Sequence, residues 1–293
     1  MVSDMDTRIK GAGTALVTPF TKDGSVDLPA LRRIVRHNLD GGIDFLCVLG
    51  TTAETPTLTS DEQMAVRRAV LDEVSGAVPL ILGFGGNNTA SMVEGLKAGD
   101  FEGFDALLVV TPFYNKPNQE GLYQHYRTLA GVSPKPIFIY NVPGRTGVNI
   151  LPETVARLAA DCPSIVGIKE ASGNIEQIRK VISLCPKDFV VLSGDDALTC
   201  EIMASGGQGV ISVASNIFPS QVAAVVHSEG EEALKANGRI EKYFGPLFQE
   251  GNPVGIKALL SVKGFCENCL RLPLVTASDA LVEFFKNDCN GND

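Results

Sequence analysis

The sequence predicts an α/β protein folded as a (β/α)8 TIM barrel with a C-terminal helical appendage. Three observations support this prediction. Eight short, continuously apolar runs recur along the chain, and their starts lie 20 to 35 residues apart. Unbroken apolar runs are typical of strands buried on both faces, as in a parallel sheet. Helical patterns fill the gaps, and eight such units in about 230 residues match a (β/α)8 barrel in size and count.

The apolar runs end in Gly, Thr, Pro or acidic residues, which interrupt strands. Strands are therefore expected at residues 14–17, 45–49, 80–82, 106–110, 137–140, 165–168, 189–192 and 209–213. Helices are expected near residues 28–39, 60–74, 89–99, 120–131, 174–184, 197–205 and 219–229. One more helix should open at Leu151-Pro152-Glu153, because proline suits the first turn.

A doubly wound open sheet with a nucleotide site is the rival fold. It would carry a glycine-rich fingerprint after an early strand. The nearest candidate, residues 83–88, lacks the final glycine of G-x-G-x-x-G, and no Walker loop is present. The barrel is therefore the favoured fold.

The strand rhythm stops after about residue 230, and three further helices are expected at 231–243, 254–265 and 277–287. We therefore expect a catalytic barrel over residues 1–230. Residues 231–293 should form a helical domain that contributes to subunit contacts.

The formal charge of −9, with no Lys- or Arg-rich stripe, argues against nucleic acids and anionic membranes as partners. No apolar run reaches the length of a membrane span, and the N-terminal residues lack the apolar core of a signal peptide. Seven cysteines, several of them in apolar runs, indicate reduced thiols in the cytoplasm. Cys266 and Cys269 form a C-x-x-C pair, but all three histidines are far away in sequence, so no metal is expected.

Lys169 directly follows the apolar run 165–168 and is the most informative residue in the chain. A lysine there would be largely desolvated, and desolvation lowers its pKa because it penalises the ammonium form. A neutral amine can attack a carbonyl carbon. Taken alone, a strand-end lysine more often extends its amine to solvent. The residues expected near Lys169 in the fold distinguish a catalytic lysine from a solvent-exposed one.

In a (β/α)8 barrel, the residues that follow each strand meet on one face, and that face holds the active site. The polar residues expected there are Thr51, Thr52, Tyr114, Tyr140, Arg145 and Lys169. Each could have an ordinary role alone, as a loop residue, a core aromatic or half of a surface ion pair. Their convergence on one rim favours a functional interpretation.

This set of residues fits carbonyl chemistry through an imine. Lys169 would be the nucleophile, and Tyr140, on the adjacent strand, would carry protons. Thr51 and Thr52 offer donors suited to a carboxylate, and Arg145 offers a bidentate fork for a second one.

Pyridoxal phosphate also forms an imine with lysine, but it needs a phosphate cup, which barrel enzymes place after strands seven and eight. The seventh strand here ends in Asp195 and Asp196, which would repel phosphate. The same acids argue against sugar-phosphate aldolases. We expect them to cap the next helix.

Six motifs, in order, resemble the dihydrodipicolinate synthase / N-acetylneuraminate lyase family. They are GTTAE at 50–54, TPFYNKP at 111–117, YNVPGRTG at 140–147, GIKEASG at 167–173, SGDDA at 193–197 and GVISV at 209–213. Residues 252–257 also resemble a family segment, so the match covers nearly the whole chain. No single motif is decisive, but six in sequence are highly specific.

The resemblance implies a class I aldolase-type reaction of pyruvate. Lys169 matches the Schiff-base lysine, and Tyr140 matches the tyrosine that relays protons. Thr51 matches the threonine that links the two tyrosines of the relay, and Thr52 the threonine that binds the pyruvate carboxylate. Tyr114 matches the tyrosine that completes the relay across a tight dimer interface.

Arg145 matches the arginine that binds the carboxylate of L-aspartate 4-semialdehyde, and siblings acting on sialic acid or keto sugar acids usually lack it. This points to the synthase branch, the first committed step of diaminopimelate and lysine biosynthesis. Ile211, in the GVISV motif, is expected to contribute to the substrate site. The resemblance further implies a homotetramer, a dimer of dimers, that needs no metal or organic cofactor.

The sequence departs from the family pattern at two backbone positions. Ala53 stands where the family usually has glycine, and a methyl group is tolerable there only if the backbone avoids positive φ. Gly255 replaces a common proline, which should change only local stiffness.

A third departure concerns regulation. In lysine-inhibited members, the effector site at the dimer interface uses His, Glu and Tyr. The matching positions here are Ser60, Gln63, Ser91 and Phe113, with only Asn87 retained. Because Ser91 cannot supply the carboxylate that lysine ammonium groups need, weak or absent inhibition by lysine is expected.

Two alternatives remain open from the sequence. One is a sibling lyase or aldolase that combines pyruvate with a sugar acid or another aldehyde. The other is a non-catalytic barrel that senses pyruvate or lysine, although a sensor need not retain the nucleophile.

Overall fold

A closed barrel of eight parallel strands forms the centre of the protein in the computed structural model, which describes residues 9–290. The strands follow one another in chain order, and the last pairs with the first. They are β1 (Gly11–Ala15), β2 (Phe45–Val48), β3 (Leu80–Phe84), β4 (Ala106–Val110), β5 (Ile137–Asn141), β6 (Ile165–Glu170), β7 (Val190–Ser193) and β8 (Gly209–Ser212). The predicted (β/α)8 fold is confirmed.

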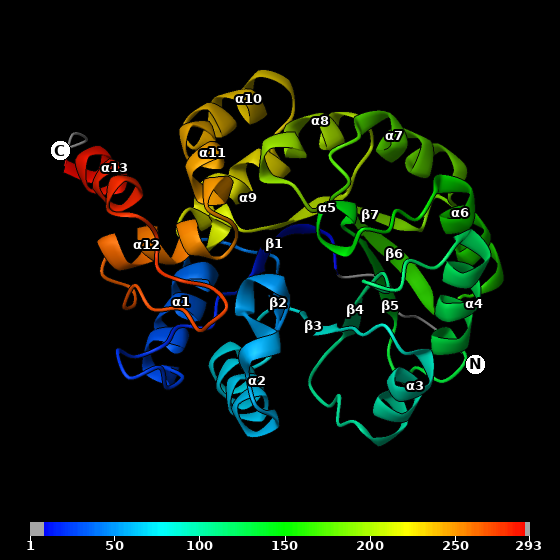
Figure 1. The fold of residues 1–293 in the computed structure, drawn as a ribbon. Helices are drawn as coiled ribbons and strands as arrows, with labels where there is room; N and C mark the ends of the chain where they lie inside the picture. The colour runs from blue at the N-terminus through cyan, green and yellow to red at the C-terminus, as the bar shows by residue number, and fades with distance from the viewer. Residues whose placement is uncertain (1–8, 291–293) are drawn as a thin grey trace.

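Helices surround this barrel (Figure 1). Those that follow the strands are α1 (Leu28–Asp40), α2 (Ser60–Val74), α3 (Thr89–Ala98), α4 (Gln119–Ala130), α5 (Pro143–Thr146), α6 (Pro152–Asp161), α7 (Ile175–Leu184), α8 (Thr199–Ala204) and α9 (Pro219–His227). Four 3-10 turns lie in the loops: η1 (Thr51–Ala53), η2 (Thr55–Thr57), η3 (Asp196–Leu198) and η4 (Ala214–Asn216). The helices bury the outward-facing apolar side chains of the strands, so the strands are covered on both faces.

The first strand begins earlier than the sequence pattern indicates. It was expected at 14–17 but spans Gly11–Ala15, because two glycines belong to it. A Cβ atom on Gly13 would lie 2.2 Å from ring atoms of Phe45 on the neighbouring strand, so only glycine fits. Glycine normally weakens a strand, and close packing of this kind is the reason for its use here.

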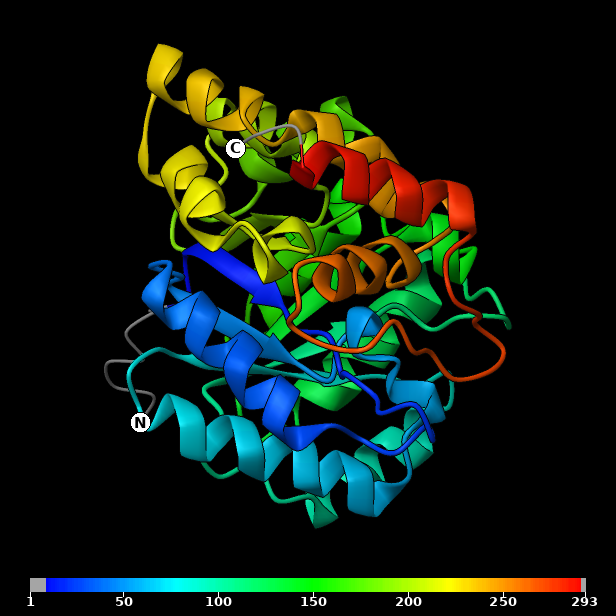
Figure 2. The same ribbon diagram turned by 90° about the vertical axis from the view of Figure 1, so that its left-hand side faces the viewer.

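Four helices follow the barrel and gather on one side of it: α10 (Gly230–Gly238), α11 (Glu241–Gln249), α12 (Val254–Val262) and α13 (Asp279–Asn290) (Figures 1 and 2). The single helix expected at 231–243 is therefore wrong. The chain breaks after Gly238, a poor helix former, and Ile240 is buried between the two helices with non-helical backbone angles.

Some sequence-based expectations fall outside the described residues. The N-terminal segment that argued against a signal peptide lies mostly in residues 1–8, and the side chain of Cys289 is also outside the described part. None of the helices in residues 9–290 is both long and apolar enough to cross a membrane.

Candidate active site

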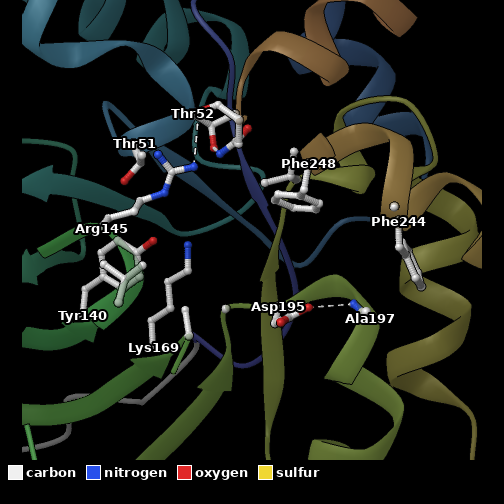
Figure 3. Close-up of a pocket in the computed structure, with 15 residues that line it drawn as sticks. Thr51, Thr52, Tyr140, Arg145, Lys169, Asp195, Ala197, Phe244 and Phe248 are labelled. Atoms are coloured by element: carbon white, nitrogen blue, oxygen red, sulfur yellow. Dashed lines mark hydrogen bonds between the residues drawn. The ribbon is translucent and has the colours of Figure 1, made fainter. Parts of the chain in front are cut away.

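A cavity of about 440 Å³ lies at the carboxyl ends of the strands, on the face where barrel enzymes hold their active sites (Figure 3). It is lined by Thr51, Thr52, Tyr140, Val142, Arg145, Lys169, Ala171, Gly194, Asp195, Ala197, Val213, Phe244, Gly245, Phe248 and Asn252. Five of the seven residues predicted from the sequence, namely Thr51, Thr52, Tyr140, Arg145 and Lys169, are among them.

Lys169 and Tyr140 occupy paired positions on the adjacent strands β6 and β5. Paired residues of neighbouring strands point to the same side, and here both side chains enter the cavity. The Lys169 Nζ atom lies 4.4 Å from the centre of the Tyr140 ring, and only 6% of the lysine is exposed. Among the described residues no carboxylate forms an ion pair with Lys169, so its amine faces the cavity unpaired.

Cys47 on β2 is close enough to Lys169 for the lysine charge to affect it, but it does not line the cavity. Cys47 is buried, and burial raises the pKa of its thiol to about 11 although the nearby Lys169 charge opposes the shift. A thiol with that pKa stays protonated and unreactive at neutral pH. Cys47 therefore does not compete with the Lys169 amine as a nucleophile.

The turn after β2 carries Thr51 and Thr52 in η1 and ends at Glu54, whose φ is +53°. The left-handed residue is therefore Glu54, and Ala53 is not among the residues with positive φ. Alanine is therefore tolerated at position 53, where the family usually has glycine. Glu54 is fully buried and forms an ion pair with Lys257 of α12.

Arg145 lies in the short helix α5, directly after β5, and its guanidinium faces the amine of Lys169 across the cavity (Figure 3). Its Nη2 atom donates to the backbone oxygen of Asn252 at 3.3 Å. The side-chain Nδ2 of Asn252 donates to Thr52 Oγ1 at 2.9 Å. Asn252 therefore connects the two positions that were expected to bind carboxylates.

Glu170, next to Lys169, points away from the cavity into a buried polar cluster. Its carboxylate accepts from Asn141 Nδ2 at 3.0 Å and from the Ser172 backbone at 2.9 Å. Burial raises the pKa of Glu170, and these hydrogen bonds oppose that shift. The cluster fixes the end of β6 and, with it, the direction of the Lys169 side chain.

Only one of the two acids expected to cap the next helix does so: Asp195 caps η3, whereas Asp196 bonds the backbone that follows β8. Asp195 Oδ1 accepts from the Ala197 backbone at 3.0 Å at the start of η3. Asp196 Oδ2 accepts from the backbones of Val213 and Ala214, both at 3.0 Å, and so ties the β7 loop to the β8 loop. Burial raises the pKa of Asp196 despite these donors.

Two predicted site residues lie outside the cavity. Tyr114 is 88% exposed and has a φ of +73°, so it projects from the β4 loop rather than into this chain's own cavity. Ile211 is buried within β8 and does not line the cavity. Their roles stay predictions.

The described residues contain no group of three or more His, Cys, Asp or Glu side chains that could hold a metal ion. Cys266 and Cys269 are free thiols, and burial raises the pKa of Cys266 to about 11. The Cys269 backbone oxygen accepts from Lys257 of α12, and neither cysteine lines the cavity that contains Lys169.

Comparison with known proteins identifies the family. The model of the dihydrodipicolinate synthetase family matches residues 8–289 of the chain. The chain belongs to the dihydrodipicolinate synthetase family. Within that family, the match spans the barrel and the helices after it, including the loop that carries Asn252.

Individual relatives agree with this assignment. The 4-hydroxy-tetrahydrodipicolinate synthase of Phocaeicola vulgatus is 49% identical, and the match covers 92% of this chain and 93% of that one. The structure of dihydrodipicolinate synthase from Thermotoga maritima has a TM-score of 0.93 at 44% identity, covering 96% and 98% of the two chains. The chloride-inhibited enzyme from Acinetobacter baumannii, solved in complex with pyruvate, has a TM-score of 0.92 at 37% identity, covering 96% and 98%.

Ten of the fifteen lining residues were not predicted as site residues from the sequence, and three of these have side chains that come from beyond the barrel: Phe244, Phe248 and Asn252. All come from α11 and the loop before α12, a region that was expected to serve subunit contacts. Figure 3 shows the two phenylalanines on the wall opposite Tyr140 and Arg145. The family-like segment beginning at Asn252 was the one available signal.

Proposed function

We propose that this protein catalyses the condensation of pyruvate with L-aspartate 4-semialdehyde, the reaction of 4-hydroxy-tetrahydrodipicolinate synthase, through a Schiff base on Lys169. The observation that supports it most directly is the unpaired Lys169 amine beside Tyr140 in a cavity that also contains Arg145. Relatives that are 46 to 49% identical over more than nine-tenths of the chain carry that name.

The first half of the reaction forms the enamine. The Lys169 amine attacks the ketone carbon of pyruvate, and the resulting carbinolamine loses water to give the imine. Tyr140 supplies and removes the protons, with Thr51 and Tyr114 completing the relay, while Thr52 binds the pyruvate carboxylate. Loss of a methyl proton then converts the imine into the nucleophilic enamine.

The second half forms the carbon–carbon bond. The enamine carbon attacks the aldehyde carbon of L-aspartate 4-semialdehyde, whose carboxylate is held by Arg145. The amino group of that substrate then attacks the imine carbon, closes the ring and displaces the Lys169 amine. The carbon–nitrogen bond to Lys169 is therefore replaced by a carbon–nitrogen bond within the product, and the free Lys169 amine is restored. These steps need no metal or organic cofactor.

Tyr114 motivates a proposal about assembly. A tyrosine that is 88% exposed in a strained backbone conformation cannot serve its own cavity, whereas it could reach a neighbouring one. We propose a homotetramer, a dimer of dimers, in which Tyr114 completes the site of the adjacent subunit. Phe113, 40% exposed beside it, supplies apolar surface for such a contact.

Two further proposals concern organisation and location. We propose a domain boundary near residue 230, between α9 and α10. It separates the catalytic barrel from a helical domain whose helix α11 lines part of the cavity. We also propose a cytoplasmic location, because the six cysteines with described side chains are all free thiols.

Trapping with borohydride tests the Schiff base, and a coupled assay tests the substrates. Reduction in the presence of pyruvate should add the pyruvate-derived group to the peptide that contains Lys169, as measured by mass spectrometry. The purified protein should also turn over pyruvate only when L-aspartate 4-semialdehyde is supplied. An unmodified Lys169 peptide would refute the mechanism, and turnover with a sugar acid instead would indicate a sibling lyase. If Lys169 is not labelled and no substrate is turned over, these results would support a non-catalytic sensor.

A further inference from the structure

The segment from Asn252 to Lys257 contacts the turn Thr51–Glu54 at two points, although the two are about 200 residues apart in sequence. At the first point, Asn252 Nδ2 donates to Thr52 Oγ1 at 2.9 Å. Both residues are buried, with 7% and 2% exposure. Because the threonine oxygen accepts this bond, its own proton stays free to donate to a ligand in the cavity.

The second contact is the buried ion pair of Glu54 and Lys257. Neither side chain has any exposed area, and Lys257 Nζ lies 2.5 Å from Glu54 Oε1. The other carboxylate oxygen accepts from the Arg271 backbone at 3.1 Å, and Lys257 Nζ also donates to the Cys269 oxygen at 3.0 Å. All the charged atoms of the pair are thus satisfied, which a buried ion pair requires.

Glu54 is the residue in the left-handed conformation at the end of the turn. For a residue other than glycine this conformation is costly and persists only where the surroundings enforce it. The ion pair fixes Glu54 from one side, and the bond from Asn252 fixes Thr52 two residues earlier. The turn is therefore held at two points, Thr52 and Glu54, by one short segment that leads into α12.

We propose that Asn252 and Lys257 act as a two-point clamp that holds Thr51–Glu54 in the conformation needed to bind the pyruvate carboxylate. This proposal rests on the proposed function. Asn252 and Lys257 are positioning residues, since they act through Thr52 and Glu54. The clamp also explains why the helices after residue 230 matter to a reaction whose chemical groups all lie on the barrel.

The clamp predicts a selective effect on one substrate. The side chain of Asn252 contacts Thr52, whereas Arg145 is bound by the Asn252 backbone oxygen, which survives any substitution. Asn252→Ala should therefore raise the KM for pyruvate about tenfold, the loss expected for a buried hydrogen bond. The KM for L-aspartate 4-semialdehyde should stay within about twofold.

Asn252→Asp should raise the pyruvate KM further than Asn252→Ala. The new carboxylate would accept the Thr52 proton, remove it from the ligand and repel the pyruvate carboxylate. The double variant Glu54→Gln/Lys257→Met tests the second point without leaving a buried charge unpaired. It should also raise the pyruvate KM and leave that of the aldehyde unchanged.

A double-mutant cycle shows whether Asn252 acts through Thr52. In a Thr52→Val background, Asn252→Ala should cause no further change in the pyruvate KM. Tyr123→Phe is a matched control, because it removes a comparable hydrogen bond, Tyr123 Oη to Asp161 Oδ2 at 2.8 Å, from outer helices α4 and α6. It should lower thermal stability without changing either KM.

The readouts separate this proposal from the proposed function. The pyruvate concentration for half-maximal borohydride trapping of Lys169 should rise in parallel with KM. If wild-type Lys169 is labelled but Asn252→Ala only lowers the melting temperature, as the control does, the clamp is refuted and the Schiff-base function stands. An equal rise of both KM values, or a shift that persists with Thr52→Val, would also refute the clamp. If wild-type Lys169 is never labelled, both proposals fail.

Discussion

The amine of Lys169 lies 4.4 Å from the centre of the Tyr140 ring, on the neighbouring strand of the barrel. This distance places the amine over the face of the Tyr140 ring, so the two side chains are in direct contact. The same register brings the Tyr140 hydroxyl close to the Lys169 amine, and both residues line the cavity (Figure 3). One strand pairing thus sets the position of both groups on which the proposed chemistry depends.

Replacing Lys169 should separate activity from stability. Lys169→Met keeps the length and apolar stem of the side chain but cannot form an imine, so kcat should fall by about 10³-fold or more. Because Lys169 is 6% exposed, removing a desolvated amine should leave the melting temperature unchanged or raise it. Activity assays and thermal denaturation measure the two effects. A large loss of stability would instead assign Lys169 a structural role.

Arg145 should be specific for the second substrate. Arg145→Ala should raise the KM for L-aspartate 4-semialdehyde by roughly 10²-fold, because a charge-assisted bidentate contact is lost. Trapping of pyruvate on Lys169 should be retained. Arg145→Lys should recover little of the lost affinity for the semialdehyde, since an ammonium group cannot make the bidentate contact of the planar guanidinium. Unchanged turnover of the semialdehyde by Arg145→Ala would favour a sibling lyase with another aldehyde.

The sequence predicted the barrel because every strand carries its own apolar run and parallel strands must be buried on both faces. The errors in the elements are local. The first strand was placed late because Gly11 and Gly13 interrupt the apolar run, and glycine is required there because a Cβ atom would meet Asp44 at Gly11 and the Phe45 ring at Gly13. The break between α10 and α11 depends on burial of Ile240, which no local pattern reveals.

The candidate site also contains residues that could be predicted from the sequence and residues that could not. Thr51, Tyr140 and Lys169 were predictable because the ends of adjacent parallel strands converge in any closed barrel. Asn252 and Phe248 were not, because their approach depends on how the C-terminal segment folds back across the barrel. Such a contact between residues 200 apart leaves no periodic signal in the sequence. The expectation of a separate subunit-contact region therefore concealed part of the cavity wall.

Mixed oligomers test whether Tyr114 serves a neighbouring subunit. Tyr114→Phe and Lys169→Met should each be impaired alone. In a mixed dimer, the intact Lys169 of one chain would receive the intact Tyr114 of the other, so one complete site is rebuilt. Co-expression with two affinity tags, followed by an activity assay, should recover activity in the doubly purified species. No recovery would show that Tyr114 acts within its own chain. Full activity of Tyr114→Phe alone would show that Tyr114 has no part in the relay.

Lysine should inhibit this protein weakly or not at all. Ser60, Gln63 and Ser91 stand at positions where inhibited family members are expected to provide groups for lysine, and none of these three side chains carries a charge. Asn87 is retained, but its Nδ2 atom already donates to the Phe113 backbone at 3.1 Å. Initial rates should change little as lysine rises into the millimolar range. Half-inhibition at low lysine concentration would contradict this prediction.

His125 should make stability depend on pH. It is 4% exposed, its Nδ1 bonds Thr89 Oγ1 at 2.8 Å, and burial lowers its pKa from 6.5 to about 4. Between pH 6.5 and 4 the unfolded chain binds this proton and the folded chain does not. Stability is therefore complete above pH 6.5 and falls as the pH drops through that window, by roughly 3 kcal/mol at most. Denaturant unfolding measures the free energy of unfolding at each pH in this range. Its dependence on pH should be weaker for His125→Gln than for the wild type. An unchanged dependence would show that His125 does not cause it.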